Sequence, residues 1–446
     1  MEKQKMLKRL ISLILCLTTL LLCTSLFSCA DANEEFTPVL RFAVASDIHI
    51  DDENSILEET RIAQLFDIAY KYADEADTYK KLDAVLLVGD LTNWGTLSQM
   101  ETLKMILDDS VKDNTLLLLS LGNHDFYTNE ELAPTYFTET FDTPTDEHIK
   151  INGFHFIRIS PSETNTYGKQ KQMWLERQLA EASSDTPNLP IFVMQHHHIL
   201  NTVYGSTRWC TDDLTDILKK YPQVVNFSGH SHFPILDPRS IWQDDFTAIG
   251  TGTMTYYEIG LNGVSPDSIF PSNAYGGWST ERVGDNRDAA QFQIVEVDES
   301  GNIKLIGYDM LANSELFVRY LDNPASASNR VKNSTKEKRS TKPFFNQGQK
   351  LIVNNITSTD FELTIPQADG DETPVESYKV EIYQNNELIK TEYVLSGYIY
   401  YPISDFVTCD ISNLQPTTEY TVKVYAVNCY NKQSAPLTIT VNTSNT

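Results

Sequence analysis

The chain has 446 residues, of which 41% are hydrophobic and 22% are charged. This length allows two or three domains that each bury a core, and the composition excludes a wholly disordered chain. The formal net charge of -26 argues against a basic surface with general affinity for nucleic acid or anionic lipid. It does not exclude a phosphorylated substrate, because bound metal ions can supply positive charge locally.

The first residues have the order of a secretory signal. A basic start precedes an apolar run over residues 10–22, which is shorter than the roughly 20 residues that a membrane-spanning helix needs. Leu26-Phe27-Ser28-Cys29 follows and resembles a bacterial lipobox, with Phe27 bulkier than usual. The resemblance implies that residues 1–28 are removed, that Cys29 carries a lipid, and that an extracytoplasmic lipoprotein is anchored to a bacterial membrane. Simple signal cleavage that leaves Cys29 as a thiol is the alternative.

A short polar tether over residues 29–38 leads into a regular pattern of strands and helices. Short apolar runs typical of buried strands alternate with apolar residues at helical spacing, which favours a buried, largely parallel sheet. The expected strands are 39–46, 84–88, 115–121, 191–194 and 224–227, the helices 57–72, 98–107 and 167–182, and a hairpin arm lies at 153–159. Helices thin out later, where strands are expected at 246–252, 292–297 and 303–308. Residues 39–322 are therefore expected to form an α/β domain of two packed mixed β-sheets flanked by helices.

The C-terminal part of the chain has a different pattern. Residues 323–343 are rich in Ser, Asn, Lys and Arg and indicate a linker, or an exposed arm that reaches the substrate phosphate. Residues 344–446 show regularly spaced strands, typical of an all-β, immunoglobulin-like sandwich; the runs are 350–353, 361–364, 378–384, 398–401 and 421–427. The segment Leu414–Tyr420 resembles the tyrosine corner of a fibronectin type III domain. We expect this sandwich to be a spacer, or a module that binds a polymer at the cell surface, without a catalytic side chain.

Side chains that bind metal ions follow five of the expected strands. The clusters are Asp47-Ile48-His49, Gly89-Asp90, Gly122-Asn123-His124-Asp125, His196-His197-His198 and Gly229-His230-Ser231-His232. Loops at the carboxyl ends of parallel strands can converge on one point. Residues two apart in an extended loop point the same way, so both histidines of the last cluster can reach one site. Imidazole, carboxylate and amide oxygen suit Zn, Mn or Fe. The number of these ligands exceeds what one tetrahedral site needs. Two metal ions that share a bridging carboxylate are therefore expected.

These motifs, in this order, resemble the calcineurin-like metallophosphoesterase superfamily over roughly residues 39–308. The resemblance implies an αββα sandwich with a first metal held by Asp47, His49 and His232 and a second by Asn123, His230 and one histidine of 196–198, with Asp90 bridging both. Counting from the preceding strand favours His196. His197 stays an alternative and His198 is the least favoured, because the family's usual Pro is absent and Ile199 follows.

Such a centre would hydrolyse phosphate mono- or diesters by attack of a hydroxide held between the metals. The resemblance implies that His124 lies near the substrate without binding metal, where it can protonate the leaving oxygen. Asp125 either orients that imidazole or caps a loop. Long aromatic loops near a catalytic edge often contact substrate. The candidates for substrate contact are Tyr204, Arg208, Tyr256 and Trp278, each of which can equally pack beneath a loop.

Two other classes of function stay open. A metal-binding surface adhesin with a degenerate phosphoesterase domain would suit the sandwich and the lipid anchor, but it needs neither His124 nor so many ligands. A metal-dependent hydrolase of another bond type is disfavoured because every ligand position matches a phosphoesterase pattern. A screen of chromogenic mono- and diesters with Mn, Zn and Fe would separate the three classes.

Overall fold

The computed structural model describes residues 36–52, 55–207, 209–257, 289–371 and 373–445. Across these ranges the model contains no helix that is both long enough and apolar enough to cross a bilayer. The expected signal peptide and Cys29 lie outside the described residues, so their roles stay predictions.

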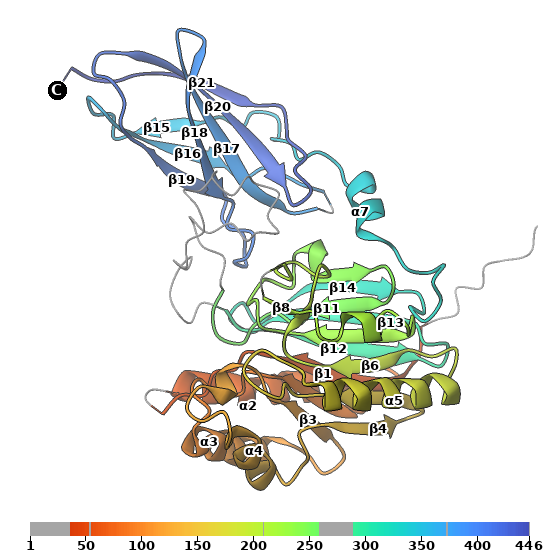
Figure 1. Ribbon diagram of the computed structural model, residues 1–446. Coiled ribbons are helices and arrows are strands. Elements are labelled where there is room, and N and C mark those ends of the chain that lie inside the picture. Colours follow the sequence, from red (N-terminus) through yellow and green to blue (C-terminus); the bar gives the residue numbers. More distant parts are fainter. Residues whose placement is uncertain (1–35, 53–54, 208, 258–288, 372, 446) are drawn as a thin grey trace, which may run out of the picture. The chain divides into compact units, whose positions relative to one another are not determined.

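The first sheet has the strand order β14-β13-β12-β1-β2-β3 (Figure 1). Its strands are β1 Pro38–Ala45, β2 Ala84–Val88, β3 Leu116–Ser120, β12 Gln291–Asp298, β13 Ile303–Asp309 and β14 Ser314–Leu321. Strands β1, β2 and β3 run parallel, whereas β12, β13 and β14 extend the sheet in antiparallel fashion. The sheet is therefore mixed, and the sequence motifs follow its three parallel strands, β1, β2 and β3.

The second sheet has the order β10-β11-β9-β6-β5-β4. Its strands are β4 Glu147–Ile151, β5 Phe154–Arg158, β6 Ile191–Met194, β9 Val224–Ser228, β10 Ile241–Gln243 and β11 Thr247–Gly250. Strands β5, β6, β9 and β11 are parallel, and β4 and β10 are antiparallel edges. The expected hairpin arm is the β4–β5 pair. Two short strands, β7 His198–Ile199 and β8 Cys210–Thr211, pair outside this sheet.

Three apolar layers hold the sheets and helices together. Phe42 of β1 meets Phe156 and Phe192 of the second sheet edge-on, with ring centroids 5.2 and 5.1 Å apart, so the sheets pack face to face. Ala43 and Ala45 of β1 belong to the opposite layer. Burial on both faces explains why the motif strands are continuous apolar runs. The outer helices are α2 Ile56–Glu75, α3 Leu97–Ser110 and α4 Ala133–Phe141 on the first sheet and α5 Lys169–Asp185 and α6 Thr215–Leu218 on the second.

The sandwich consists of two sheets, β15-β16-β19 and β18-β17-β20-β21. Its strands are β15 Ile352–Asn354, β16 Phe361–Pro366, β17 Val375–Gln384, β18 Glu387–Leu395, β19 Phe406–Ile411, β20 Glu419–Asn428 and β21 Leu437–Asn442. Alternate residues of β20, such as Val422 and Val424, fill the core between the sheets. The hydroxyl of buried Tyr420 accepts a hydrogen bond from the Gln415 amide at 2.7 Å. The predicted fold class and tyrosine corner are confirmed.

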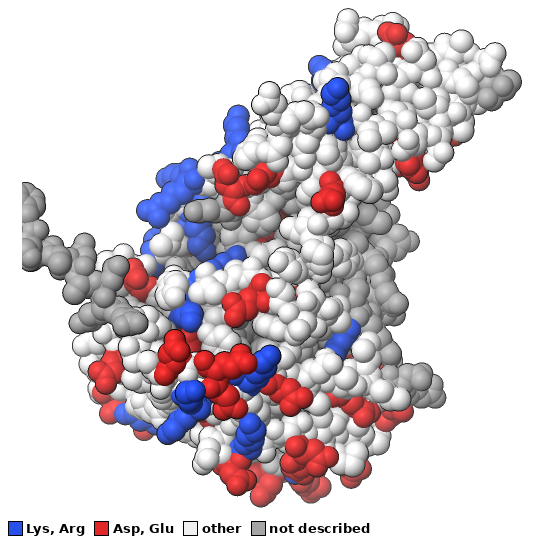
Figure 2. Space-filling view, turned by 180° about the vertical axis from the view of Figure 1, so that it is seen from behind, with Lys and Arg blue, Asp and Glu red and all other residues white. Residues whose placement is uncertain are grey.

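One expectation about local structure was wrong. Residues 398–401 form turns and bends, not a strand, because Tyr398 and Ile399 bury their side chains against Tyr204, Phe233 and Tyr257. The arm contains a helix, α7 Asn333–Arg339, in the region where basic side chains gather at the left of Figure 2. Sequence analysis also missed α4, β14, β18, β19 and β21.

The first part of the basic arm contacts the amino-end edge of the second sheet, and Lys336, further along, donates to the carbonyls of Pro238 and Ile241. Arg330 donates to the carbonyls of Pro222 and Asp245, both at 2.8 Å, and Lys332 pairs with Asp244. Pro222 precedes β9, and Asp244 and Asp245 precede β11, whereas the metal-binding motifs follow the carboxyl ends of their strands. Whether residues 330–339 of the arm also reach the substrate phosphate stays a prediction.

A buried ion pair joins the two folded parts, which lie within one compact unit from Pro38 onward. Glu376 of β17 accepts from Arg239 Nη2 at 2.5 Å and from the Tyr204 hydroxyl at 3.2 Å. Asp237 holds the same guanidinium with two further bonds and accepts from the Tyr398 hydroxyl at 3.1 Å. Burial raises the pKa of Glu376, although Arg239 opposes that shift. The sandwich is therefore fixed to the segment that follows His232, and its role as a spacer or polymer-binding module stays a prediction.

We expect Glu376→Ala to lower the free energy of unfolding by about 1–3 kcal/mol, because it leaves buried donors of Arg239 and Tyr204 without an acceptor. Denaturant titration measures the change. The matched control is Glu75→Ala, which breaks an exposed pair with Lys71 and should change stability by less than about 0.5 kcal/mol. Equal effects of the two substitutions would show that the buried pair does not stabilise the fold.

Candidate metal centre

The five motifs meet where both sheets end. Asp47 and His49 follow β1, Asp90 follows β2 and Asn123 follows β3, all in the first sheet. The remaining candidates, His196 and the pair His230 and His232, follow β6 and β9 of the second sheet. Since the sheets pack face to face, their parallel strands deliver these side chains to one shared edge.

One group of possible ligands contains Asp47, His49, Asp90 and His232, all buried. His232 Nε2 lies 3.2 Å from Asp47 Oδ1 and 3.3 Å from His49 Nε2. His49 Nε2 lies 3.9 Å from Asp90 Oδ2. These are the residues that the family resemblance assigned to the first metal, with the bridging carboxylate.

A second group contains Asp90, His196 and His230. His196 Nε2 lies 3.1 Å from Asp90 Oδ2 and 3.1 Å from Asn123 Oδ1. The amide oxygen of Asn123 thus faces the same point as the imidazole. Asp90 is common to both groups, so the two possible sites share one carboxylate.

The donor atoms fit cations. Asp90 Oδ2 is buried and, apart from its ion pair with His196 Nε2 at 3.1 Å, makes no hydrogen bond within the described residues. Leaving a buried carboxylate oxygen unsatisfied is costly, and a metal ligand is one arrangement that removes this cost. Two imidazole Nε2 atoms facing each other at 3.3 Å likewise suit a shared cation. Imidazole, carboxylate and amide ligands match Zn, Mn or Fe.

Neighbouring groups orient the ligands. His196 Nδ1 lies 2.9 Å from the Val88 carbonyl, and His232 Nδ1 lies 2.9 Å from the Tyr256 carbonyl, so each ring turns Nε2 to the centre. The Asn123 Nδ2 donates to the Tyr127 hydroxyl at 2.8 Å, which turns its oxygen inward. Sequence analysis missed these acceptors because backbone carbonyls carry no residue signature.

The backbone of the motifs is strained. Asp47, His49, Asp90, His230 and His232 all have positive φ, between 48° and 72°. Non-glycine residues adopt this conformation only when the surroundings enforce it, and such residues cluster at functional sites. The expectation of an extended loop at His230-Ser231-His232 is wrong. As a result the two imidazoles enter different groups rather than one.

Two motif glycines allow this close approach. A Cβ added to Gly122 would lie 2.2 Å from Asp90 Oδ1, and one added to Gly229 would lie 2.5 Å from Asp47 Oδ2. Either methyl group would push a candidate ligand out of place. Glycine at these two motif positions therefore allows neighbouring loops to approach each other closely.

Burial and charge set the proton equilibria of the site. Burial alone would raise the pKa of Asp47 and Asp90, but neighbouring histidines outweigh burial and lower both values. Burial lowers the pKa of His49 and His230, which keeps them neutral, the form that binds metal. For His196, burial lowers the pKa, but Asp90 raises it to about 9. A cation bound here would displace that proton.

The other two histidines of the 196–198 cluster face elsewhere. His197 lies 3.5 Å from the Tyr167 hydroxyl and 3.3 Å from Asn165 Oδ1. His198 bonds to the hydroxyls of Ser228 and Ser231 at 2.8 and 2.7 Å, and so braces the loop that carries His230. Burial lowers the pKa of both rings to about 3. The geometry therefore favours His196 over His197 as the ligand.

His124 lies beside the two groups without joining either. Its Nδ1 lies 3.0 Å from the Asn93 carbonyl, and its ring meets His49 edge-on at 4.5 Å. Its Nε2 makes no hydrogen bond within the described residues, and the ring is half-buried. This imidazole is held at one nitrogen and available at the other, which suits proton donation.

Asp125 does not orient His124. Its carboxylate accepts from the amides of Thr92 and Gly122 at 2.9 and 2.8 Å and from the Thr92 hydroxyl at 2.7 Å. Burial raises its pKa to about 6, and the charge of Asp90 adds to that shift. The expected catalytic role is therefore corrected to the capping of two loops, and the Asn93 carbonyl orients the imidazole instead.

The four expected substrate contacts have different outcomes. Tyr204 is corrected: it is buried, Arg239 lies 3.6 Å above its ring, and its hydroxyl donates to Glu376. Tyr256 does border the centre, since its ring lies 4.3 Å from that of His232. Arg208 and Trp278 lie outside the described residues, so their roles stay predictions.

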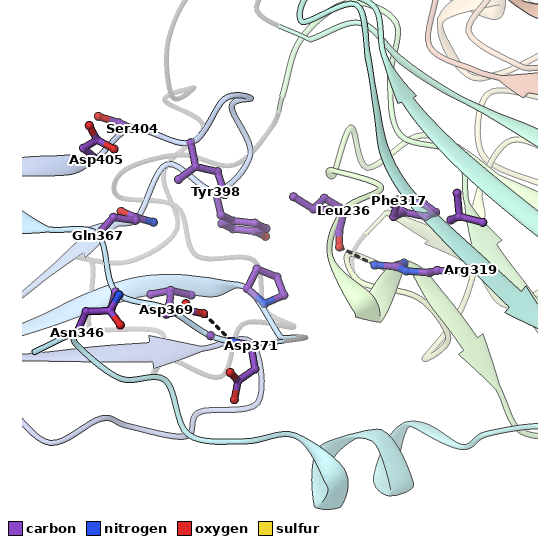
Figure 3. Close-up of a pocket in the computed structure, with 16 residues that line it drawn as sticks. Leu236, Phe317, Arg319, Asn346, Gln367, Asp369, Asp371, Tyr398, Ser404 and Asp405 are labelled. Atoms are coloured by element: carbon purple, nitrogen blue, oxygen red, sulfur yellow. Dashed lines mark hydrogen bonds between the residues drawn. The ribbon is translucent and has the colours of Figure 1, made fainter.

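A cavity of about 760 Å³ lies away from this centre (Figure 3). Leu236, Phe317 and Arg319 line one side, and sandwich residues including Tyr398 line the other. None of the candidate ligands borders it. We place the chemistry at the ligand groups, because reaction requires convergent polar atoms rather than cavity volume.

Comparison with protein families identifies both parts of the chain. The model for calcineurin-like phosphoesterases matches residues 40–234, and the model for fibronectin type III domains matches residues 347–440. No curated protein matches the chain.

Solved structures that resemble the chain include β-sandwich domains. A computationally redesigned β-sandwich protein is 24% identical, with 24% of this chain and 93% of that chain covered and a TM-score of 0.18. The FN5 domain of Drosophila Lar is 16% identical, with 24% and 97% covered and a TM-score of 0.16. By the two family models, the chain joins a calcineurin-like phosphoesterase domain at residues 40–234, whose His and Asp groups could hold metal ions, to a fibronectin type III domain at residues 347–440.

Proposed function

We propose that the phosphoesterase domain hydrolyses phosphate mono- or diesters with two metal ions bridged by Asp90. The single observation that carries this proposal is the presence of Asp90 in both groups of possible ligands. Asp47, His49 and His232 would complete one site, and Asn123, His196 and His230 the other. When bound, the ions would neutralise phosphate oxygens and lower the pKa of a bound water, so that hydroxide is available to attack at neutral pH.

The protein's own groups would do the remaining work. His124 is placed to give the proton on Nε2 to the leaving oxygen, because the Asn93 carbonyl holds Nδ1. The carbonyls of Val88 and Tyr256 would keep the ligating rings in register. A metal-binding adhesin would require no proton donor beside the ligand groups, which is why we favour hydrolysis.

The metal content should be about two ions per chain after reconstitution with Mn or Zn. Asp90→Ala should lower the content below one, because both sites lose a ligand, whereas His230→Ala should remove about one ion. Elemental analysis of chelator-free protein measures this. Asp108→Ala, which changes an exposed carboxylate on α3, is the control. An Asp90→Ala variant with full metal content would contradict the shared carboxylate.

His124→Ala should lower kcat by roughly 10²–10⁴-fold if the ring is the proton donor. Metal content should stay at the wild-type level, since only the backbone amide of His124 contacts Asp90. Esters with good leaving groups should lose less activity, because they need less protonation. Steady-state kinetics on phenyl and p-nitrophenyl esters tests this, with His148→Ala as control. A uniform loss on all esters would argue against proton donation.

We also propose that Cys29 carries the lipid that anchors the protein outside the cytoplasm. The support is the lipobox-like sequence Leu26–Cys29 after an apolar run. In a bacterial host, Cys29→Ser should abolish incorporation of labelled fatty acid and shift the protein from the membrane fraction. Fatty-acid labelling and fractionation measure both effects. Unchanged labelling of the variant would refute lipidation at Cys29.

A further inference from the structure

Two aromatic side chains stand exposed next to the proton-donor candidate. Trp94 is 51% exposed and Tyr127 is 48% exposed. Their ring centroids lie 6.3 Å apart, and the Tyr127 ring lies 4.4 Å from that of His124. Leaving large apolar rings in water forgoes the stabilisation of burial, so an exposed pair beside a reactive group suggests a binding role. We call Trp94 and Tyr127 the aromatic shelf.

The shelf is held rigidly although its rings are exposed. The Trp94 carbonyl accepts from the Thr128 amide at 2.9 Å, and the Trp94 amide donates to Gln99 Oε1 at 2.9 Å. The Tyr127 hydroxyl accepts from Asn123 Nδ2 at 2.8 Å. The loop after β2 and the segment after β3 are thereby tied together and to a candidate ligand. A rigid, preorganised surface loses little entropy when it binds a partner.

The other aromatic residues at the centre pack against the ligands. Tyr256 lies 4.3 Å from His232 and 5.5 Å from His49, and Trp209 meets His230 edge-on at 5.4 Å. Both rings therefore cover ligands. The shelf differs because it contacts His124 and not a candidate metal ligand ring. His124 lies on the side where the leaving oxygen would receive its proton. The shelf should therefore face the alcohol portion of the ester.

We propose that the aromatic shelf binds the base of a nucleotide, so that the leaving alcohol is a nucleoside. The inference rests on the proposed phosphoesterase function. Tyr127 separates Trp94 from His124, so a planar group stacked on Trp94 needs a spacer between itself and the ester oxygen. The sugar of a nucleoside provides that spacer, whereas a phenyl ester has none. In the reaction the ester P–O bond breaks, a water oxygen bonds to phosphorus, and the nucleoside leaves with the proton from His124.

Matched substrates measure the contribution of the base. AMP and ribose 5-phosphate carry the same primary ester and differ in the base. Stacking of about 1–3 kcal/mol per base gives a preference for AMP of about 5- to 150-fold in kcat/KM. Trp94→Ala should remove most of the preference by lowering kcat/KM for AMP toward the value for ribose 5-phosphate.

Two variants serve as controls. Met105→Ala removes another exposed apolar side chain, on α3, and should leave the preference unchanged. Tyr127→Phe keeps the ring but removes the hydroxyl that accepts from Asn123. It should preserve the preference for the base and weaken metal binding by about 10–100-fold, the usual effect of losing a group that orients a ligand.

A binding measurement tests the aromatic shelf independently of the proposed function. Adenosine should quench tryptophan fluorescence of the full chain with or without metal, and the quenching should disappear in Trp94→Ala. Failure of metal-loaded protein to hydrolyse any ester would overturn the proposed function, while quenching would still support the shelf. Equal kcat/KM for AMP and ribose 5-phosphate, or quenching unchanged in Trp94→Ala, would overturn the shelf.

Discussion

The buried carboxylate of Asp90 is the constraint around which the rest of the centre is arranged. Its Oδ1 accepts from the His124 amide, and its Oδ2 lies among imidazoles without a hydrogen bond of its own within the described residues. A buried negative charge is tolerated only beside compensating positive charge. In the protein alone the proton on His196 supplies part of that charge, which is why the pKa of this histidine is raised to about 9. A pair of cations would satisfy the same carboxylate more completely. The site is therefore electrostatically suited to bind cations.

This arrangement depends on backbone conformations that the local sequence disfavours. Five candidate ligands have positive φ, a conformation with a cost of order 1–3 kcal/mol per residue. The packing of two sheets on a continuous apolar layer stabilises these loops, because the strands before them are fully buried. The motif glycines then let one loop approach the ligand carried by another. Five of the sixteen non-glycine residues with positive φ in the described ranges therefore lie at the edge where the chemistry is expected, and the stabilisation comes from the core behind it.

The C-terminal β-sandwich also contacts the segment next to the candidate metal centre. Glu376 reaches Arg239 and Tyr204, and Tyr204 packs on Phe233 with ring centroids 4.4 Å apart. Phe233 directly follows the candidate ligand His232, so the interface stabilises the loop that carries it. Breaking a buried pair exposes the remaining charge to an apolar environment. A domain joined in this way restrains the end of a metal-binding loop, which a flexible spacer would not do.

The sequence by itself determined the fold class and the identity of the metal-binding residue types. Buried strands give apolar runs, ligands follow them in short motifs, and Tyr420 marks the sandwich corner, all of which are local signals. Only the tertiary structure decided which side chains meet. His196, His197 and His198 are chemically identical, and their roles differ because one ring points to Asp90, one to Asn165 and one to Ser231. The alternatives left open for Asp125 and Tyr204 were decided in the same way, since their partners Thr92 and Glu376 lie far from them in sequence. Side-chain direction depends on backbone angles and on packing between distant segments, which no local pattern specifies.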